Sequence, residues 1–166
     1  MPITRKIDLI ACLIGCLVLA SAYYLELYVG LKPCPLCILQ RYLFVLLILL
    51  FFLGALLPLL NFARRLYHGF VFLIAGLGVA AAGWHVWLTT LPHEQVPPCE
   101  ASLYIMLKYL PIKQVINNIL RAGGDCSDVQ WHFLNLNLPM WSLIAFIILA
   151  LIALWQIFYK ENLWVK

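Results

Sequence analysis

Charged residues are scarce in this sequence. Of its 166 residues, 11% are charged and 65% are hydrophobic, and the mean hydropathy is +0.97. So little charge excludes an ordinary soluble domain and indicates an integral membrane protein. The few basic residues are scattered rather than clustered, which leaves no case for a nucleic-acid partner. A chain of this length is expected to form a single membrane domain over residues 1–166.

Four apolar stretches are long enough to cross a bilayer, which takes about 20 residues of helix. They cover residues 8–29, 36–60, 67–91 and 139–159. One long polar segment, residues 92–138, separates the third stretch from the fourth. We therefore expect an all-α, four-helix bundle in the lipid bilayer, with both termini on the same side.

The first apolar stretch lacks a small-residue cleavage site of the kind that ends a signal peptide. Its apolar run is also too long for one, and Glu26 lies in its distal part. We expect an uncleaved membrane anchor.

Basic residues in the short segments predict the orientation, because such residues are enriched on the cytoplasmic side. They precede the first stretch, separate the second from the third, and follow the fourth: Arg5 and Lys6, Arg64 and Arg65, Lys160 and Lys166. The termini are thus expected in the cytoplasm. The first connection and the long polar segment are expected on the outer side.

Six cysteines divide into two groups. Cys12 and Cys16 lie within the first apolar stretch, four residues apart on one helix face, and are interpreted as packing residues. The other four are expected on the outer, oxidising side, where thiols tend to pair. They are Cys34, Cys37, Cys99 and Cys126.

The outer cysteines favour a redox relay over structural disulfides. Cys34 and Cys37 form a C-x-x-C pair, whose ring closes too small a loop to restrain the unfolded chain much. Such pairs commonly cycle between redox states. Cys99 and Cys126 are too far apart in sequence to supply the second half of a four-thiolate zinc site, so no metal is expected.

Cys37 has two local reasons to be a thiolate. It falls in the first turn of the second apolar helix, where free N–H groups favour negative charge. Arg41 follows four residues later and shares its helix face. A guanidinium at the membrane boundary usually has a partner. Arg41 could stabilise the thiolate, donate hydrogen bonds to a carbonyl of a bound acceptor, or extend to the interface.

The polar segment contains a candidate surface helix. Pro111 begins a run with four apolar residues on one face and polar residues on the other, and a glycine pair ends it. The apolar face is Val115, Ile116, Ile119 and Leu120. We expect a short amphipathic helix that lies flat on the outer leaflet.

These motifs together resemble the DsbB family of quinone-dependent membrane thiol oxidases, which act in bacterial disulfide formation. The resemblance spans nearly the whole chain. It is carried by Cys34-Pro-Leu-Cys37-Ile-Leu-Gln-Arg41-Tyr, the Trp87-Leu approach to Cys99, Gly124-Asp-Cys126, Trp131 and Pro139-Met-Trp141.

The resemblance implies a sequence of disulfide exchanges. A Cys99–Cys126 disulfide would oxidise a soluble thioredoxin-fold dithiol protein similar to DsbA, whose thiolate attacks Cys99. Cys126 would then exchange with the Cys34–Cys37 disulfide. Cys37 would pass the electrons to ubiquinone or menaquinone of the membrane pool, helped by Arg41. The location implied is the bacterial inner membrane, with cytoplasmic termini and periplasmic cysteines.

Other residues and functions stay open at this point. His85 and His93 are candidates for quinone contact, and Glu26 is either solvated or involved in proton transfer. His68 and His132 have no predicted role. The alternatives to the general oxidase are a related oxidase dedicated to one partner and a non-enzymatic membrane scaffold with structural disulfides.

Overall fold

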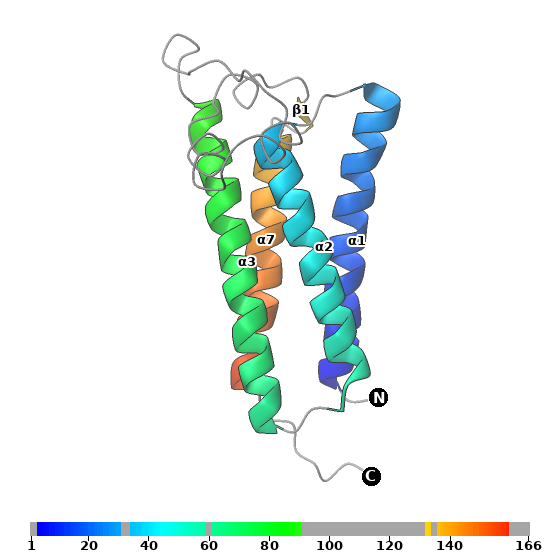
Figure 1. Cartoon of the computed structure of the whole chain (residues 1–166), viewed down its shortest axis with the longest axis vertical. Coiled ribbons are helices and arrows are strands. Elements are labelled where there is room, and N and C mark those ends of the chain that lie inside the picture. The colour runs from blue at the N-terminus through cyan, green and yellow to red at the C-terminus, as the bar shows by residue number, and fades with distance from the viewer. Residues whose placement is uncertain (1–2, 31–33, 59–60, 91–131, 134–135, 160–166) are drawn as a thin grey trace, which may run out of the picture.

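Four long helices form most of the described part of the chain, which covers residues 3–30, 34–58, 61–90, 132–133 and 136–159 of a computed structural model. The helices are α1 (Ile3–Val29), α2 (Pro35–Leu56), α3 (Asn61–Thr89) and α7 (Leu138–Phe158). Each is long and apolar enough to cross a membrane. They alternate in direction as an up-and-down bundle (Figure 1). The predicted all-α membrane bundle is confirmed.

The two ends of the bundle carry different residues (Figure 1). α1 begins and α7 finishes at one end, which we call the terminal end. α2 begins at the other end of the bundle, which we call the cysteine end. Cys34 is its N-cap residue and Cys37 lies in its first turn. The polar segment between α3 and α7 lies largely outside the described residues, so the predicted amphipathic helix after Pro111 stays a prediction.

Helix bounds at the terminal end differ from the predicted spans. α1 begins at Ile3 rather than residue 8, and α3 at Asn61 rather than residue 67. Both extra turns carry polar residues that find partners inside the bundle. α2 finishes at Leu56 rather than residue 60 because Pro58 follows. A proline disfavours the helical conformation in the preceding residue, and Leu57 is extended, with φ −78° and ψ 128°.

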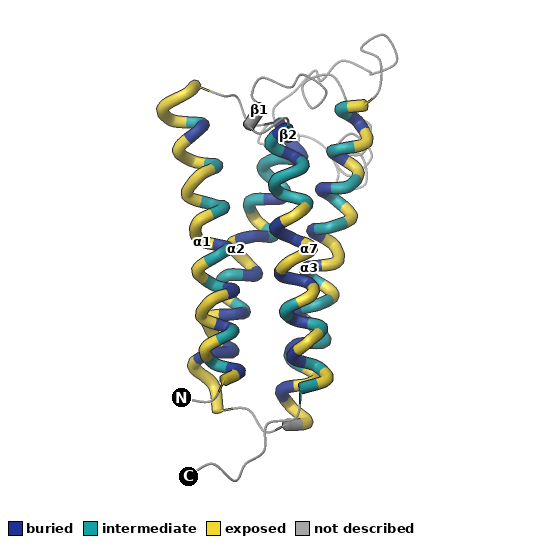
Figure 2. The backbone as a smooth tube through the Cα atoms, turned by 180° about the vertical axis from the view of Figure 1, so that it is seen from behind, coloured by how far each residue is buried: buried dark blue, intermediate teal, exposed yellow. Residues whose placement is uncertain are grey.

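A buried seam holds the helices together. α1 packs along α2 and α3 along α7 as the two most extensive pairs. The rings of Phe44 and Phe146 stack between α2 and α7, with centroids 4.0 Å apart. Gly78 of α3 makes room for this stack, since a β-carbon there would overlap the Phe146 ring. Buried residues face inward and exposed ones outward (Figure 2), so a largely apolar surface is left for lipid.

Polar side chains pair in the interior of the terminal half. Asp8 of α1 accepts a hydrogen bond from Gln156 Nε2 of α7 at 2.6 Å, and its other oxygen lies 3.8 Å from His68 Nε2 of α3. All three side chains are at most 2% exposed. Arg64 donates to Thr4 Oγ1 at 3.2 Å. Pairing is what makes such groups tolerable away from water, and here it joins three helices.

A short hairpin leads into α7 at the cysteine end. Strand β1 (His132–Phe133) pairs antiparallel with β2 (Leu136–Asn137). Asn137 is the N-cap of α7, and it also donates to Thr89 Oγ1 of α3 at 3.2 Å. These strands were not predicted from the sequence. The Asn137–Thr89 hydrogen bond ties the start of α7 to the end of α3.

Candidate functional site

The Cys34–Cys37 pair is built into the N-terminus of α2. Cys34 is the N-cap residue, and its sulfur accepts a hydrogen bond from the Cys37 backbone nitrogen at 3.3 Å. Pro35, at the first helical position, needs no N–H partner there. Both cysteines are free thiols, and the Cys34 thiol donates to Cys37 Sγ across 3.1 Å. The helix N-terminus stabilises negative charge on such sulfur atoms.

His85 of α3 reaches the same sulfur atoms from the neighbouring helix. Its Nε2 lies 3.6 Å from Cys34 Sγ, and its Nδ1 lies 3.2 Å from Gln40 Nε2. His85 and Gln40 are 2% and 3% exposed. Leu36 and Leu88 pack around Cys34. A polar row of Gln40, His85, Cys34 and Cys37 therefore crosses from α2 to α3 and back, enclosed by apolar side chains.

The contacts along this row are consistent with one set of donors. With the Gln40 amide nitrogen facing His85 Nδ1, that ring nitrogen accepts and Nε2–H faces the Cys34 sulfur. The Cys34 thiol in turn faces Cys37 Sγ. In this arrangement each contact of the row joins one donor to one acceptor.

Arg41 is held by α1 as well as by its own helix. Its guanidinium forms an ion pair with Glu26 and donates to the Ala22 carbonyl at 3.4 Å. It also lies 4.8 Å above the centre of the Tyr23 ring. The pair with Glu26 was missed in the sequence analysis, which treated each residue separately. Opposite charges at the same depth of two antiparallel helices were the available signal.

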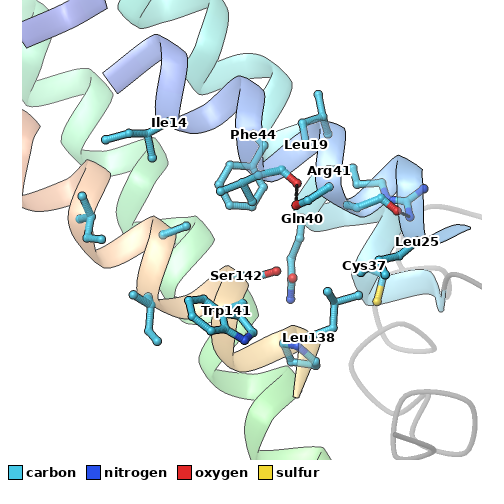
Figure 3. Close-up of a pocket in the computed structure, with 17 residues that line it drawn as sticks. Ile14, Leu19, Leu25, Cys37, Gln40, Arg41, Phe44, Leu138, Trp141 and Ser142 are labelled. Carbon is cyan, nitrogen blue, oxygen red and sulfur yellow. Dashed lines mark hydrogen bonds between the residues drawn. The ribbon is translucent and has the colours of Figure 1, made fainter. Parts of the chain in front are cut away.

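A cavity of about 400 Å³ opens beside Cys37 and Arg41. Every described residue that lines it comes from α1, α2 or α7, and most are apolar (Figure 3). Its polar lining is concentrated near the cysteine end, and Phe44 and Trp141 contribute aromatic rings to the wall. The polar lining residues are Ser21, Cys37, Gln40, Arg41 and Ser142. Such a cavity suits a flat apolar ring that carries a few hydrogen-bond acceptors.

The structure brings together only part of the predicted site. Cys34, Cys37 and His85 form one cluster, and Arg41 lies on the cavity beside it. His85 contacts Cys34 and is absent from the described lining of the cavity. Cys99, Cys126 and His93 lie outside the described residues. Cys12 and Cys16 belong to α1, where Cys12 packs against the buried core.

Gln40 is the site residue that the sequence analysis did not single out. It follows Cys37 by three positions and precedes Arg41, so it occupies the same face of α2 as the cysteine. A buried amide in a membrane helix needs a partner, and His85 is that partner. The only available signal was one uncharged polar residue in an apolar run.

Comparison with known proteins identifies relatives over most of the chain. Residues 4–156 match the family model described as "Disulfide bond formation protein DsbB". A Pseudomonas aeruginosa protein named disulfide bond formation protein B 1 is 41% identical over 149 residues, which are 89% of this chain and 91% of that protein. A disulfide bond formation protein B from Acinetobacter baumannii is 42% identical over 154 residues, covering 87% and 88%. No solved structure gives a significant match.

Proposed function

Because the chain belongs to the DsbB family of disulfide bond formation proteins, we propose that it is a quinone-dependent disulfide oxidoreductase of the bacterial inner membrane. It reoxidises a periplasmic thioredoxin-fold dithiol protein similar to DsbA and passes the electrons to ubiquinone or menaquinone. The observation that carries the proposal is the position of Cys37: its sulfur belongs to a thiol pair, and the residue also lines an apolar cavity.

The cavity fits the ring of a quinone. Most of its lining is apolar or aromatic, and the polar groups at the cysteine end can meet a ring carbonyl. A bound quinone supplies a two-electron acceptor that takes up two protons as it becomes the hydroquinone. Cys37 provides the electron-rich sulfur, and Cys34 then closes the disulfide with it. Two thiols become one disulfide, so electrons and protons balance.

Arg41 has the position to orient the acceptor. It lines the cavity about one helical turn from Cys37, and its guanidinium offers several N–H donors. Glu26 and the Ala22 carbonyl occupy part of that donor capacity. We assign Arg41 to one carbonyl oxygen of the quinone, where its charge also stabilises negative charge that develops on the ring.

His85 has the position to stabilise the Cys34 sulfur. Closing the disulfide requires the Cys34 thiol to lose its proton, and a His85 Nε2–H that faces the sulfur would stabilise the negative charge left there. Gln40 holds the opposite ring nitrogen and so fixes the orientation of the ring. His85 would therefore act on the reaction through Cys34. Direct contact of His85 or His93 with the quinone remains a prediction.

Cys99 and Cys126 complete the proposed relay. Their disulfide oxidises the soluble partner by way of a mixed disulfide at Cys99, and the released Cys126 thiolate attacks the Cys34–Cys37 disulfide. The direction is favourable only if the final acceptor is more oxidising than the partner, as is expected of a membrane quinone when the partner is itself a strong oxidant.

The relay is tested with purified protein, a reduced thioredoxin-fold dithiol protein and a short-chain quinone, followed by the quinone absorbance. Cys37→Ser should abolish quinone reduction. Cys99→Ala should block oxidation of the partner, yet the chemically reduced Cys34–Cys37 pair should still react with quinone in a single turnover. The double variant Cys12→Ala/Cys16→Ala removes the two thiols outside the relay and should turn over normally. Partner turnover that survives Cys37→Ser or Cys99→Ala would refute the relay.

A further inference from the structure

Three metal-binding atoms converge at the start of α2. They are the sulfur atoms of Cys34 and Cys37 and Nε2 of His85, all within 4.8 Å of one another. Cys34 and His85 are 5% and 2% exposed, so the ligands lie in a low-dielectric setting. Two cysteines and one histidine are a ligand set used by zinc proteins. From the sequence alone, zinc was excluded only as a site of four thiolates, and His85 was not among the candidate ligands.

We propose that the reduced Cys34–Cys37 pair and His85 form a reversible binding site for a thiophilic divalent cation of the zinc type. Zinc binds sulfur at about 2.3 Å and imidazole nitrogen at about 2.0–2.1 Å, so tetrahedral ligand atoms lie roughly 3.5–3.8 Å apart. Cys34 Sγ and His85 Nε2 are already 3.6 Å apart. The two sulfur atoms, 3.1 Å apart, would separate slightly, and Cys37 Sγ and His85 Nε2, which lie within 4.8 Å of each other, would move to a tetrahedral spacing. Three protein ligands leave a fourth position for water.

Gln40 supports this site through the His85 ring nitrogen that does not face the sulfur atoms. A histidine that binds a metal usually donates its other ring N–H to a nearby acceptor, which fixes the ring. Gln40 already contacts His85 Nδ1. A half-turn of the amide puts the Gln40 oxygen at that place, where it accepts from Nδ1–H and leaves the Nε2 lone pair free for the cation. The same residue can therefore serve the thiol pair and the metal-bound state.

Cation binding depends on the redox state of the pair. Only thiolates bind such ions strongly, so the disulfide form retains a single ligand of the set, His85. Binding displaces the Cys34 thiol proton and engages both sulfur atoms, which can then neither close a disulfide nor reduce an acceptor. If the proposed oxidase function holds, the cation arrests the enzyme in its reduced state until it is removed.

Cadmium titration of the purified full chain tests the site, because sulfur-to-cadmium charge transfer absorbs in the ultraviolet. A Cys99→Ser/Cys126→Ser background removes the other outer thiols. The reduced protein should bind one equivalent and the oxidised protein none, and zinc should displace the cadmium. Cys34→Ser should abolish binding. Cys12→Ala/Cys16→Ala is the matched control and should leave the titration unchanged.

Variants of the histidine and its amide partner separate this site from binding by two thiols alone. His85→Ala should weaken binding by at least about tenfold, and His85→Cys should restore it by returning a soft ligand. Gln40→Leu should weaken it by about tenfold, whereas Gln40→Glu should strengthen it, since a carboxylate is a better acceptor for Nδ1–H. Equal cadmium affinity of the wild type and His85→Ala would refute the proposal.

The metal site and the oxidase function can be tested independently of each other. Quinone reduction measured without metal reports on the oxidase, and cadmium absorbance reports on the site. Quinone turnover without cadmium binding would overturn the inference and leave the oxidase intact. Binding of one equivalent of cadmium without any quinone turnover would support the metal site and overturn the oxidase function.

Discussion

At the scale of single residues, the guanidinium of Arg41 is held against α1 by Glu26, the Ala22 carbonyl and the Tyr23 ring, and Arg41 also lines the cavity. In the proposed function, the carbonyl of a bound acceptor would therefore compete with the Glu26 carboxylate for the same donors. The ion pair keeps the cation partnered near lipid when the cavity has no occupant.

This competition makes the two charged residues act in opposite directions. Arg41→His shortens the side chain and removes most of its donors, so the apparent quinone KM should rise about tenfold, which corresponds to about 1.4 kcal/mol of lost interaction. Glu26→Gln keeps Arg41 but weakens its other partner, so the KM should fall. Steady-state kinetics over a range of quinone concentrations measures both. An unchanged KM for Arg41→His would remove Arg41 from the acceptor site.

At the scale of helices, the contact between α3 and α7 depends on one missing side chain. Gly78 faces Phe146, and a methyl group there would lie far inside van der Waals contact with the ring. Overpacking of this kind costs about 1–3 kcal/mol. Phe146 also stacks on Phe44, so the strain would reach α2 as well.

Gly78→Ala should accordingly lower the thermal stability of the detergent-solubilised protein. Gly76 lies two residues earlier in the same helix, and a β-carbon added there would meet nothing within 4 Å, so Gly76→Ala is the matched control. It should be neutral or slightly stabilising, because alanine favours helix over glycine. Equal melting temperatures for the two variants would contradict the packing argument. Gly78→Ala combined with Phe146→Leu should recover part of the loss.

The helices themselves follow from long apolar runs, and the sequence predicted all four. Their bounds were least accurate where polar residues continue a helix. Thr4 of α1 and Arg64 of α3 lie in the turns before the predicted spans, but they pair with each other inside the bundle and remain helical. A hydropathy pattern cannot anticipate those partners, because they come from other helices.

The candidate site, like the helices, was predictable from the sequence only where it depends on local spacing. The spacing of Cys34, Cys37 and Arg41 is local, so motif and helix geometry were enough to place them. The contact of His85 with Cys34 and Gln40 joins residues at least 45 positions apart, and the Arg41–Glu26 pair depends on how α1 packs on α2. Such contacts arise only once the helices pack.

At the scale of the whole molecule, the start of α1 and the end of α7 lie at the opposite end of the bundle from the thiol pair (Figure 1). The positive-inside rule predicts that the terminal end faces the cytoplasm, because Arg5, Lys6, Arg64 and Arg65 belong to segments at that end. Electrons from a periplasmic partner would then enter at the cysteine end and leave sideways into the lipid.

Labelling of intact cells tests this orientation. In a background with Cys12, Cys16, Cys99 and Cys126 replaced, a membrane-impermeant maleimide should modify the remaining Cys34–Cys37 pair once the outer membrane is permeabilised and the pair is reduced. A single cysteine introduced at Arg65, with the pair also replaced, should react only after the inner membrane is opened. The reverse pattern would place the thiol pair in the cytoplasm, out of reach of a periplasmic partner.

The described lining of the cavity comes from α1, α2 and α7, while the contact that governs Cys34 comes from α3. Gln40 of α2 takes part in both, but the α1 and α7 walls of the cavity are separate from the α3 contact. If the cavity holds the quinone as proposed, substitutions on α1 and α7 would adapt the protein to a host with a different lipid-soluble carrier without changing the contact at Cys34. Substitutions on α3 would retune the thiols while those walls are preserved, so the two traits would be able to evolve one at a time.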